Sequence, residues 1–200
     1  MFIKKYIRNF AAAFPSAAGM MPWEVTTNLQ DILRQLIESL GGDYHVSNGI
    51  AIHRTARIEE HVILKGPLIV GAGCFIGSHA YLRNGVYLGS NSSIGPACEI
   101  KTSIILDHTE IAHLNFVGDS IFGSNINFEA GAIAANYYNE RPDKKIPVLV
   151  GNEIVATGVE KFGSLVGDGC RIGANAVLSP GTILIPGSIV KRLELVEQLK

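Results

Sequence analysis

The chain has 200 residues, of which 47% are apolar and 18% charged, so it can form one domain with a substantial core. The net charge of -1 leaves no excess of Lys or Arg to neutralise a phosphate backbone, which argues against nucleic acid as a partner. No apolar run reaches the roughly 18 residues that cross a bilayer, so no membrane span is expected.

Residues 1–49 precede the regular part of the sequence and are expected to form an N-terminal arm with one helix. The basic start followed by apolar residues resembles a secretory signal, but the apolar stretch is short and broken, which favours a surface arm and a cytoplasmic protein. Apolar residues at helical spacing between 27 and 40, followed by Gly41 and Gly42, predict a helix that caps the first coil of the repeat that follows.

Residues 50–190 carry a repeat with a period of six. A period of six does not fit an amphipathic helix, whose apolar face recurs at three and four residues, so it predicts an all-β solenoid of short parallel strands. The residue two places before each repeated aliphatic position is mostly small or apolar, and both positions are expected to point inward. Phe116, Phe122 and Phe128 mark a stretch with a shifted phase. The repeated positions are Ile52, Ile58, Leu64, Val70, Ile76, Leu82, Leu88, Ile94, Ile100, Leu106, Val166, Ile172, Leu178, Leu184 and Val190.

The three cysteines, Cys74, Cys98 and Cys170, all fall on the small inward position. Their odd number and the absence of CxxC spacing argue against a disulfide framework or a cysteine zinc site. A packing role is therefore expected.

Two segments depart from the repeat. Residues 138–147 are polar and contain Pro142, so they are expected to loop out of the solenoid, where exposed loops often carry function. Residues 191–200 mix apolar and charged side chains at helical spacing and are expected to cover the last coil as a C-terminal cap.

Arg83 and Lys101 are the first candidates for ligand binding. They follow the inward residues Leu82 and Ile100, so both should point outward. They are three hexads apart, which is one full coil of the presumed solenoid, so they should lie on adjacent coils. Neighbouring parallel strands lie about 4.8 Å apart, and two cations at that distance repel each other unless an anion lies between them. A guanidinium and an ammonium suit a phosphate group, although spacing alone allows two solvated surface cations equally well.

His113 lies where the regularity fails, in the stretch that follows Leu106. Departures from local rules tend to mark function. An imidazole titrates near neutral pH, as removal of a proton from an attacking amine requires, so His113 is a candidate general base. By composition alone, a structural or surface histidine remains the alternative.

Five short segments give the sequence a resemblance to a known family. In order and separation, they resemble the acetyltransferase half of the bifunctional enzymes that make UDP-N-acetylglucosamine, within the hexapeptide-repeat acyltransferases. The resemblance covers roughly residues 50–190 and implies a left-handed parallel β-helix with three hexads per coil, in a homotrimer. The segments are Ala80–Gly85, Glu99–Lys101, Ala112–Asp119, Asn125–Asn127 and Ala135–Tyr137.

The resemblance also implies roles for individual residues. His113 would remove a proton from the amine of glucosamine 1-phosphate, which attacks the thioester of acetyl-CoA, the co-substrate. Arg83 and Lys101 would hold the sugar phosphate, and Glu99 would orient the histidine. No metal and no permanently bound cofactor are implied. The remaining substrate contacts would come from Phe116, Asn127, Asn136 and Tyr137, and Lys144 or Lys145 would meet the phosphates of the donor.

The chain departs from the family pattern in three places. Phe116 stands where these enzymes usually carry a tyrosine, which removes a hydroxyl group and leaves the acceptor sugar open. No Gly-rich GxGTRM-like nucleotide-binding word occurs, so nucleotidyl transfer is not expected. Residues 153–163 resemble archaeal-type sugar-1-phosphate nucleotidylyltransferases more than the bacterial bifunctional enzymes.

Two other functions are compatible with the same repeat. A γ-class carbonic anhydrase would need a third zinc ligand beside His108 and His113, but its expected position is Ala72, which cannot bind a metal. A non-catalytic scaffold, or a partner of a separate nucleotidyltransferase, is favoured by Phe116. The joint presence of the other candidate site residues argues against a scaffold.

Overall fold

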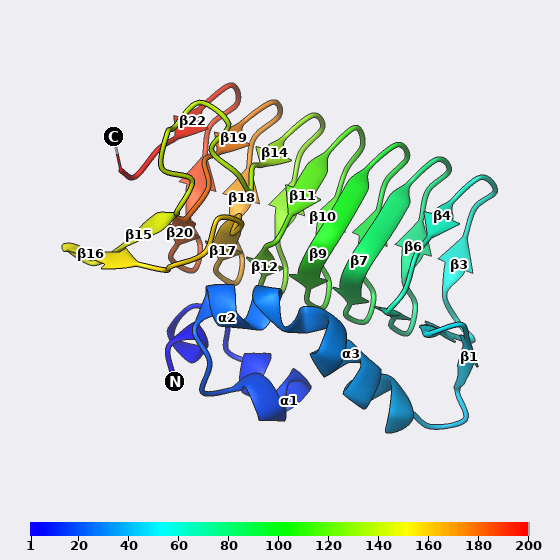
Figure 1. The fold of residues 1–200 in the computed structure, drawn as a ribbon. Helices are drawn as coiled ribbons and strands as arrows, with labels where there is room; N and C mark the ends of the chain where they lie inside the picture. The colour runs from blue at the N-terminus through cyan, green and yellow to red at the C-terminus, as the bar shows by residue number, and fades with distance from the viewer. Residues whose placement is uncertain (200) are drawn as a thin grey trace.

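The computed structural model describes residues 1–199 and forms a parallel β-solenoid whose short strands stack from coil to coil (Figure 1). The parallel β-helix predicted from the period of six is thereby confirmed. Each coil contributes strands to three faces, which we call faces A, B and C in chain order. Strands β7 and β9 run across two faces, and they join faces A and C into one 13-stranded sheet.

Face A is formed by β2 (Ile50–His53), β5 (Leu68–Val70), the second halves of β7 (Tyr81–Leu88) and β9 (Glu99–Ile105), β12 (Ile121–Phe122), β17 (Ser164–Val166) and β20 (Thr182–Leu184). An antiparallel strand, β1 (Tyr44–Ser47), extends β2 at one edge.

Face B is the 7-stranded parallel sheet of β3 (Arg57–Ile58), β6 (Phe75–Ile76), β8 (Ser93–Ile94), β10 (Glu110–Ile111), β13 (Asn127–Phe128), β18 (Arg171–Ile172) and β21 (Ile189–Val190).

Face C holds β4 (Ile63–Leu64), the first halves of β7 and β9, β11 (Phe116–Gly118), β14 (Ile133–Ala134), β19 (Val177–Leu178) and β22 (Leu195–Val196).

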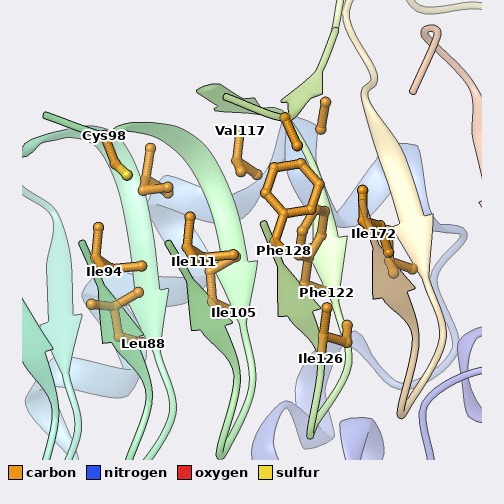
Figure 2. Packing of buried hydrophobic residues seen from close by; sticks show 14 of the residues in the cluster. Leu88, Ile94, Cys98, Ile105, Ile111, Val117, Phe122, Ile126, Phe128 and Ile172 are labelled. Carbon is orange, nitrogen blue, oxygen red and sulfur yellow. The ribbon is translucent and has the colours of Figure 1, made fainter. Parts of the chain in front are cut away.

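The core consists of rows of side chains that stack inside the solenoid (Figure 2). The predicted inward residues from Val70 to Ile100 are buried there, as are all three cysteines. Each row lets an inward side chain pack on its counterpart in the next coil, so one hydrophobic core runs through the repeats.

Between Leu88 and Phe128, the coils are one residue shorter than the hexad phase predicts, whereas the last coil keeps the hexad period and pairs Val166 with Leu184. In β7, Asn84 and Gly85, both with positive φ, form a bulge between the pairs Arg83–Lys101 and Val86–Ser103. Beyond the bulge the register is shifted by one residue, so Leu88 pairs with Ile105 and not with Leu106. The predictions for Ile104 and Leu106 are therefore wrong, because both side chains point out of the solenoid core and pack in an apolar cluster with the N-terminal helices. The prediction for Phe116 is wrong as well, since Val117 takes the inward position.

The N-terminal residues form a pad of helices on face A, and not the expected surface arm. Face A carries an outward row of apolar side chains, including Ile69, Ile104 and Ile121, which would face solvent if the N-terminal helices did not cover them. The pad buries Ile3 and Phe14, among others, against that row. Its elements are η1 (Ile3–Lys5), α1 (Phe10–Ala13), η2 (Pro15–Ala17), α2 (Pro22–Thr27) and α3 (Leu29–Glu38).

The predicted helix is present as α3, but it does not cap the first coil. It lies along the side of the solenoid against β5, β7 and β9, as the blue helices below the coils in Figure 1 show. The reason is again the apolar outer row of face A. This row offers the helix apolar surface on many coils, whereas the end of the solenoid offers the surface of only one coil.

The loop predicted at residues 138–147 belongs to a longer excursion between β14 and β17. It includes an antiparallel hairpin of β15 (Pro147–Val150) and β16 (Glu153–Ala156), and Tyr138 anchors it by donating a hydrogen bond to the Pro180 carbonyl. The predicted C-terminal cap is wrong for residues 191–199, which continue the solenoid: β22 pairs in parallel with β19 as the last strand of face C. Lys200, the last residue of the predicted cap, lies outside the described residues. Within residues 1–199, no helix is long and apolar enough to cross a bilayer.

Candidate active site

Arg83 and Lys101 lie in register on neighbouring coils of face C, as their spacing predicts. Their side chains differ in environment. Arg83 is about one quarter exposed, with a side-chain exposure of 28%, whereas Lys101 has only 11%. The sequence gives no reason to distinguish the two cations, but in the structure Arg83 is accessible to solvent and Lys101 is almost fully shielded from it.

Each of these cations already has a carboxylate partner. The Nε and Nη2 atoms of Arg83 both lie 2.7 Å from Oε1 of Glu99, and the Nζ of Lys101 bonds to Oδ2 of Asp119. The expectation of two bare cations with an anion between them is therefore incomplete, because the group of four carries no net charge. Tyr81 also lies beside Arg83, whose guanidinium carbon is 5.6 Å from the ring centroid.

Asp119 is a site residue that the sequence reasoning missed. Its Oδ2 accepts hydrogen bonds from both Lys101 and the side-chain amide of Asn136, and its own backbone N–H donates to the Lys101 carbonyl. The signal was its place two residues after inward Val117, in the family-like segment. Asp119 thereby connects two predicted substrate residues that are far apart in the sequence.

Gly118 leaves room for the side chains that lie over it. A Cβ at this position would lie 2.7 Å from Nδ2 of Asn136 and 2.8 Å from Cζ of Phe116. Phe116 pairs in register with Glu99 on the coil before it. Arg83, Glu99, Lys101, Phe116 and Asn136 are thus brought together on face C.

His113 lies at the corner between faces B and C, after β10 and before β11. It is exposed, and its carbonyl accepts the backbone N–H of Gly131 in the next coil at 3.0 Å. The following residue, Leu114, has a φ of 59° and is exposed as well. The corner therefore presents the imidazole to solvent beside the edge of face C.

Asn127 lies apart from this group. It is on β13 of face B, in register with Glu110 and Arg171, and donates to Oε2 of Glu110 at 3.3 Å. Within one chain, the structure does not bring it to Arg83 and Lys101.

A groove of about 670 Å³ runs over the later coils of face B. Its cations, Arg171, Lys191 and Arg192, outnumber its one carboxylate, Glu129. The guanidinium of Arg192 holds both oxygens of Glu129 at 2.9 Å, which lowers the pKa of that carboxyl and raises the pKa of Arg192. Ile189 adds an exposed apolar side chain, so the groove combines positive charge with apolar surface.

Tyr137, Lys144 and Lys145 lie on the excursion. The ammonium of Lys144 is 5.2 Å from the centroid of the Tyr137 ring and donates to the carbonyls of Tyr138 and Asn139. Lys145 is exposed, and its backbone N–H donates to Asp143. The Lys144 ammonium is therefore bound to carbonyls of its own loop, whereas Lys145 is exposed to solvent.

The cysteines have no features of a nucleophile. All three are buried, and burial raises the pKa of each thiol. In residues 1–199, no three His, Cys, Asp or Glu side chains are grouped so that they could hold a metal ion.

Two family models match the chain. The model described as "GMPPB C-terminal domain" matches residues 64–160, and "Hexapeptide repeat of succinyl-transferase" matches residues 165–191.

Curated relatives share the sequence at moderate identity. "Bifunctional protein GlmU" of Methanococcus vannielii is 33% identical over 84% of this chain and 41% of the relative. A "Bifunctional sugar-1-phosphate nucleotidylyltransferase/acetyltransferase" of Sulfurisphaera tokodaii is 30% identical over 86% of this chain and 45% of the relative. The chain thus spans less than half the length of these two proteins.

Among solved structures, the acetyltransferase domain of PglB from Neisseria gonorrhoeae has a TM-score of 0.45 and 16% identity, over 82% of this chain and 64% of that one. The repeat itself, together with the matches in sequence, shows that the chain belongs to the hexapeptide-repeat transferase family.

Proposed function

We propose that the protein is an acetyl-CoA-dependent N-acetyltransferase that acts on an amino-sugar 1-phosphate, with glucosamine 1-phosphate as the leading acceptor. The observation that carries the proposal is the grouping of Arg83, Lys101 and Asn136 on face C, beside the corner that holds His113. The matched part of the Sulfurisphaera tokodaii relative, whose name includes an acetyltransferase, supports the same reaction.

In the proposed reaction, the His113 imidazole takes a proton from the acceptor amine while the nitrogen attacks the thioester carbonyl. The tetrahedral oxyanion needs N–H donors near the carbonyl oxygen. Its collapse breaks the C–S bond, and the imidazolium returns the proton to the leaving thiolate. No covalent enzyme intermediate forms, so the burial of the cysteines is compatible with this route.

The groove on face B is the proposed site for the donor. Lys191, which is exposed, suits the phosphates of acetyl-CoA best, because Arg192 holds Glu129 and Arg171 donates to backbone carbonyls. Exposed Ile189 suits the apolar parts of the donor arm. Lys145, which is exposed, remains a second candidate for the donor phosphates, and Lys144 is less suited because it donates to two carbonyls. Tyr137 is proposed to contact the substrate near the transferred acetyl group.

We also propose a homotrimer in the cytoplasm. Asn127 and the groove lie on face B, whereas the phosphate-binding residues lie on face C, and the helical pad occupies face A. If face B of one subunit met face C of the next, Asn127 would approach the acceptor and the groove would open toward it.

The experiment is thiol release from acetyl-CoA, measured with glucosamine 1-phosphate and a panel of other amino-sugar phosphates. The comparison is between the intact protein and His113→Ala, with His45→Ala as the control because His45 is an exposed histidine on β1, far along the chain from the site. Turnover that is lost only in His113→Ala supports the proposal and names the acceptor.

A non-catalytic scaffold, or a partner of a separate nucleotidyltransferase, is the second candidate. Phe116 favours it, because no hydroxyl lies at that position on face C. The absence of thiol release with every acceptor, from a protein of verified oligomeric state, would make this the better reading.

A further inference from the structure

The Arg83–Glu99 pair occupies the guanidinium that the proposed acceptor phosphate would need. Both the Nε and Nη2 atoms of Arg83 point at the same Glu99 oxygen, at 2.7 Å. These are the two N–H groups that a guanidinium uses to hold a phosphate in a bidentate contact. In the free protein, a carboxylate therefore stands where a ligand anion would bind.

The neighbouring pair cannot respond in the same way. Lys101 and Asp119 have side-chain exposures of 11% and 9%, and Asn136 donates to the same Asp119 oxygen. Separating them would leave a charge buried without a partner, which is costly. Arg83 and Glu99, with side-chain exposures of 28% and 35%, can separate into water at a much smaller cost.

Charge balance requires one pair to open. Arg83, Lys101, Glu99 and Asp119 sum to no net charge, so a phosphate that added itself to the closed group would face two carboxylates as well as two cations. Movement of Glu99 into solvent leaves a positive site with Arg83 accessible and Lys101 behind it.

We propose that Glu99 is an internal competitor for Arg83, and that a phosphate monoester binds by displacing the Glu99 carboxylate while Lys101, Asp119 and Asn136 stay in place. The inference rests on the proposed function, since it concerns the same acceptor site. It assigns Glu99 a role in setting the affinity for the acceptor.

The test is equilibrium binding by calorimetry, without acetyl-CoA, of inorganic phosphate and of glucosamine 1-phosphate. Glu99→Gln removes the competing charge at almost constant size, and both ligands should bind about two- to fivefold more tightly than to the intact protein, as expected for a partly exposed pair. Glu99→Ala should show the same gain and serves as a second variant if the first folds poorly.

Two controls separate competition from a general loss of negative charge. Asp31→Asn makes the same charge change in the exposed pair with Arg34 on α3 and should leave the affinity unchanged. In an Arg83→Gln background, adding Glu99→Gln should give no gain, because the guanidinium for which Glu99 competes is gone.

Equal or weaker phosphate binding by both Glu99 variants would overturn the proposal. So would a gain that persists without Arg83, or the absence of phosphate binding to the intact protein and both variants. Failure of acetyl transfer is a separate result. Tighter phosphate binding in Glu99→Gln, together with no thiol release by the intact protein, would keep the competition and reject the acetyltransferase.

Discussion

The Lys101 ammonium and the Asp119 carboxylate form an ion pair that is almost closed to solvent, and the Asn136 amide binds the same carboxylate oxygen. Breaking a buried pair by removing one charge is expensive because the other charge stays buried. Asp119→Asn should therefore lower the free energy of unfolding by about 3–5 kcal/mol, as measured by urea denaturation.

Adding Lys101→Met to Asp119→Asn should recover part of this loss, since no unpaired charge then remains. Asp31→Asn, in an exposed pair, should cost less than about 1 kcal/mol. Unchanged stability in Asp119→Asn would show that the pair is open to water.

The corner glycine Gly95 lies below the turn that presents His113. A Cβ at Gly95 would lie 1.4 Å from the Ala112 carbonyl oxygen, so the backbone of the next coil would have to move. Gly95→Ala should cost about 3 kcal/mol or more in unfolding free energy. Gly19, where a Cβ meets nothing within 4 Å, provides the matched control. Equal melting temperatures for the two alanine variants would contradict this account of the corner.

Arg83 and His113 should have separable effects on the proposed reaction. Loss of a hydrogen bond to a charged group costs about 1.5–3 kcal/mol, so Arg83→Gln should raise the KM for the acceptor roughly tenfold to a hundredfold. His113→Ala should instead lower kcat, because the imidazole acts in the transition state. Steady-state kinetics with varied acceptor would show the split, and an Arg83→Gln effect on kcat alone would argue against a binding role.

The three cysteines should resist thiol reagents in the folded protein. Each is buried, and burial raises the pKa of each thiol, so little thiolate forms near neutral pH and little of it is accessible. Labelling with iodoacetamide, followed by mass spectrometry, should modify none of them before unfolding and all of them in denaturant. Rapid labelling of any one in the native protein would show an opening of that coil.

The Glu129–Arg192 pair should add a pH-dependent contribution to stability. Hydrogen bonding to Arg192 lowers the pKa of the Glu129 carboxyl in the folded state, so the contribution is present above the carboxyl pKa of the unfolded chain and is lost as the pH falls through the folded value. Melting temperatures of the intact protein and Glu129→Gln should differ near neutral pH and converge in acid. A difference that stays constant at all pH values would exclude the ion pair as its cause.

Much of this fold could be predicted from local pattern. The period of six marks the inward residues of the early coils because each hexad repeats the same strand and turn, whatever lies elsewhere in the chain. With three hexads per coil, as the family resemblance implies, the same periodicity places Arg83 beside Lys101. The prediction failed at Ile104, Leu106 and Phe116, after a bulge in β7 had changed the register, because a bulge depends on how two coils pair and not on one hexad.

The sequence by itself determined the solenoid, its core and the two cations of the candidate site. Only the tertiary structure decided which carboxylates neutralise them, that Asn127 lies on a different face, and that the N-terminal helices cover face A. The physical reason is the separation along the chain of the residues that interact. Strand periodicity is encoded within a few residues, whereas an ion pair such as Lys101–Asp119, or the contact of Phe14 with Tyr87, depends on side chains that meet only when coils and helices pack.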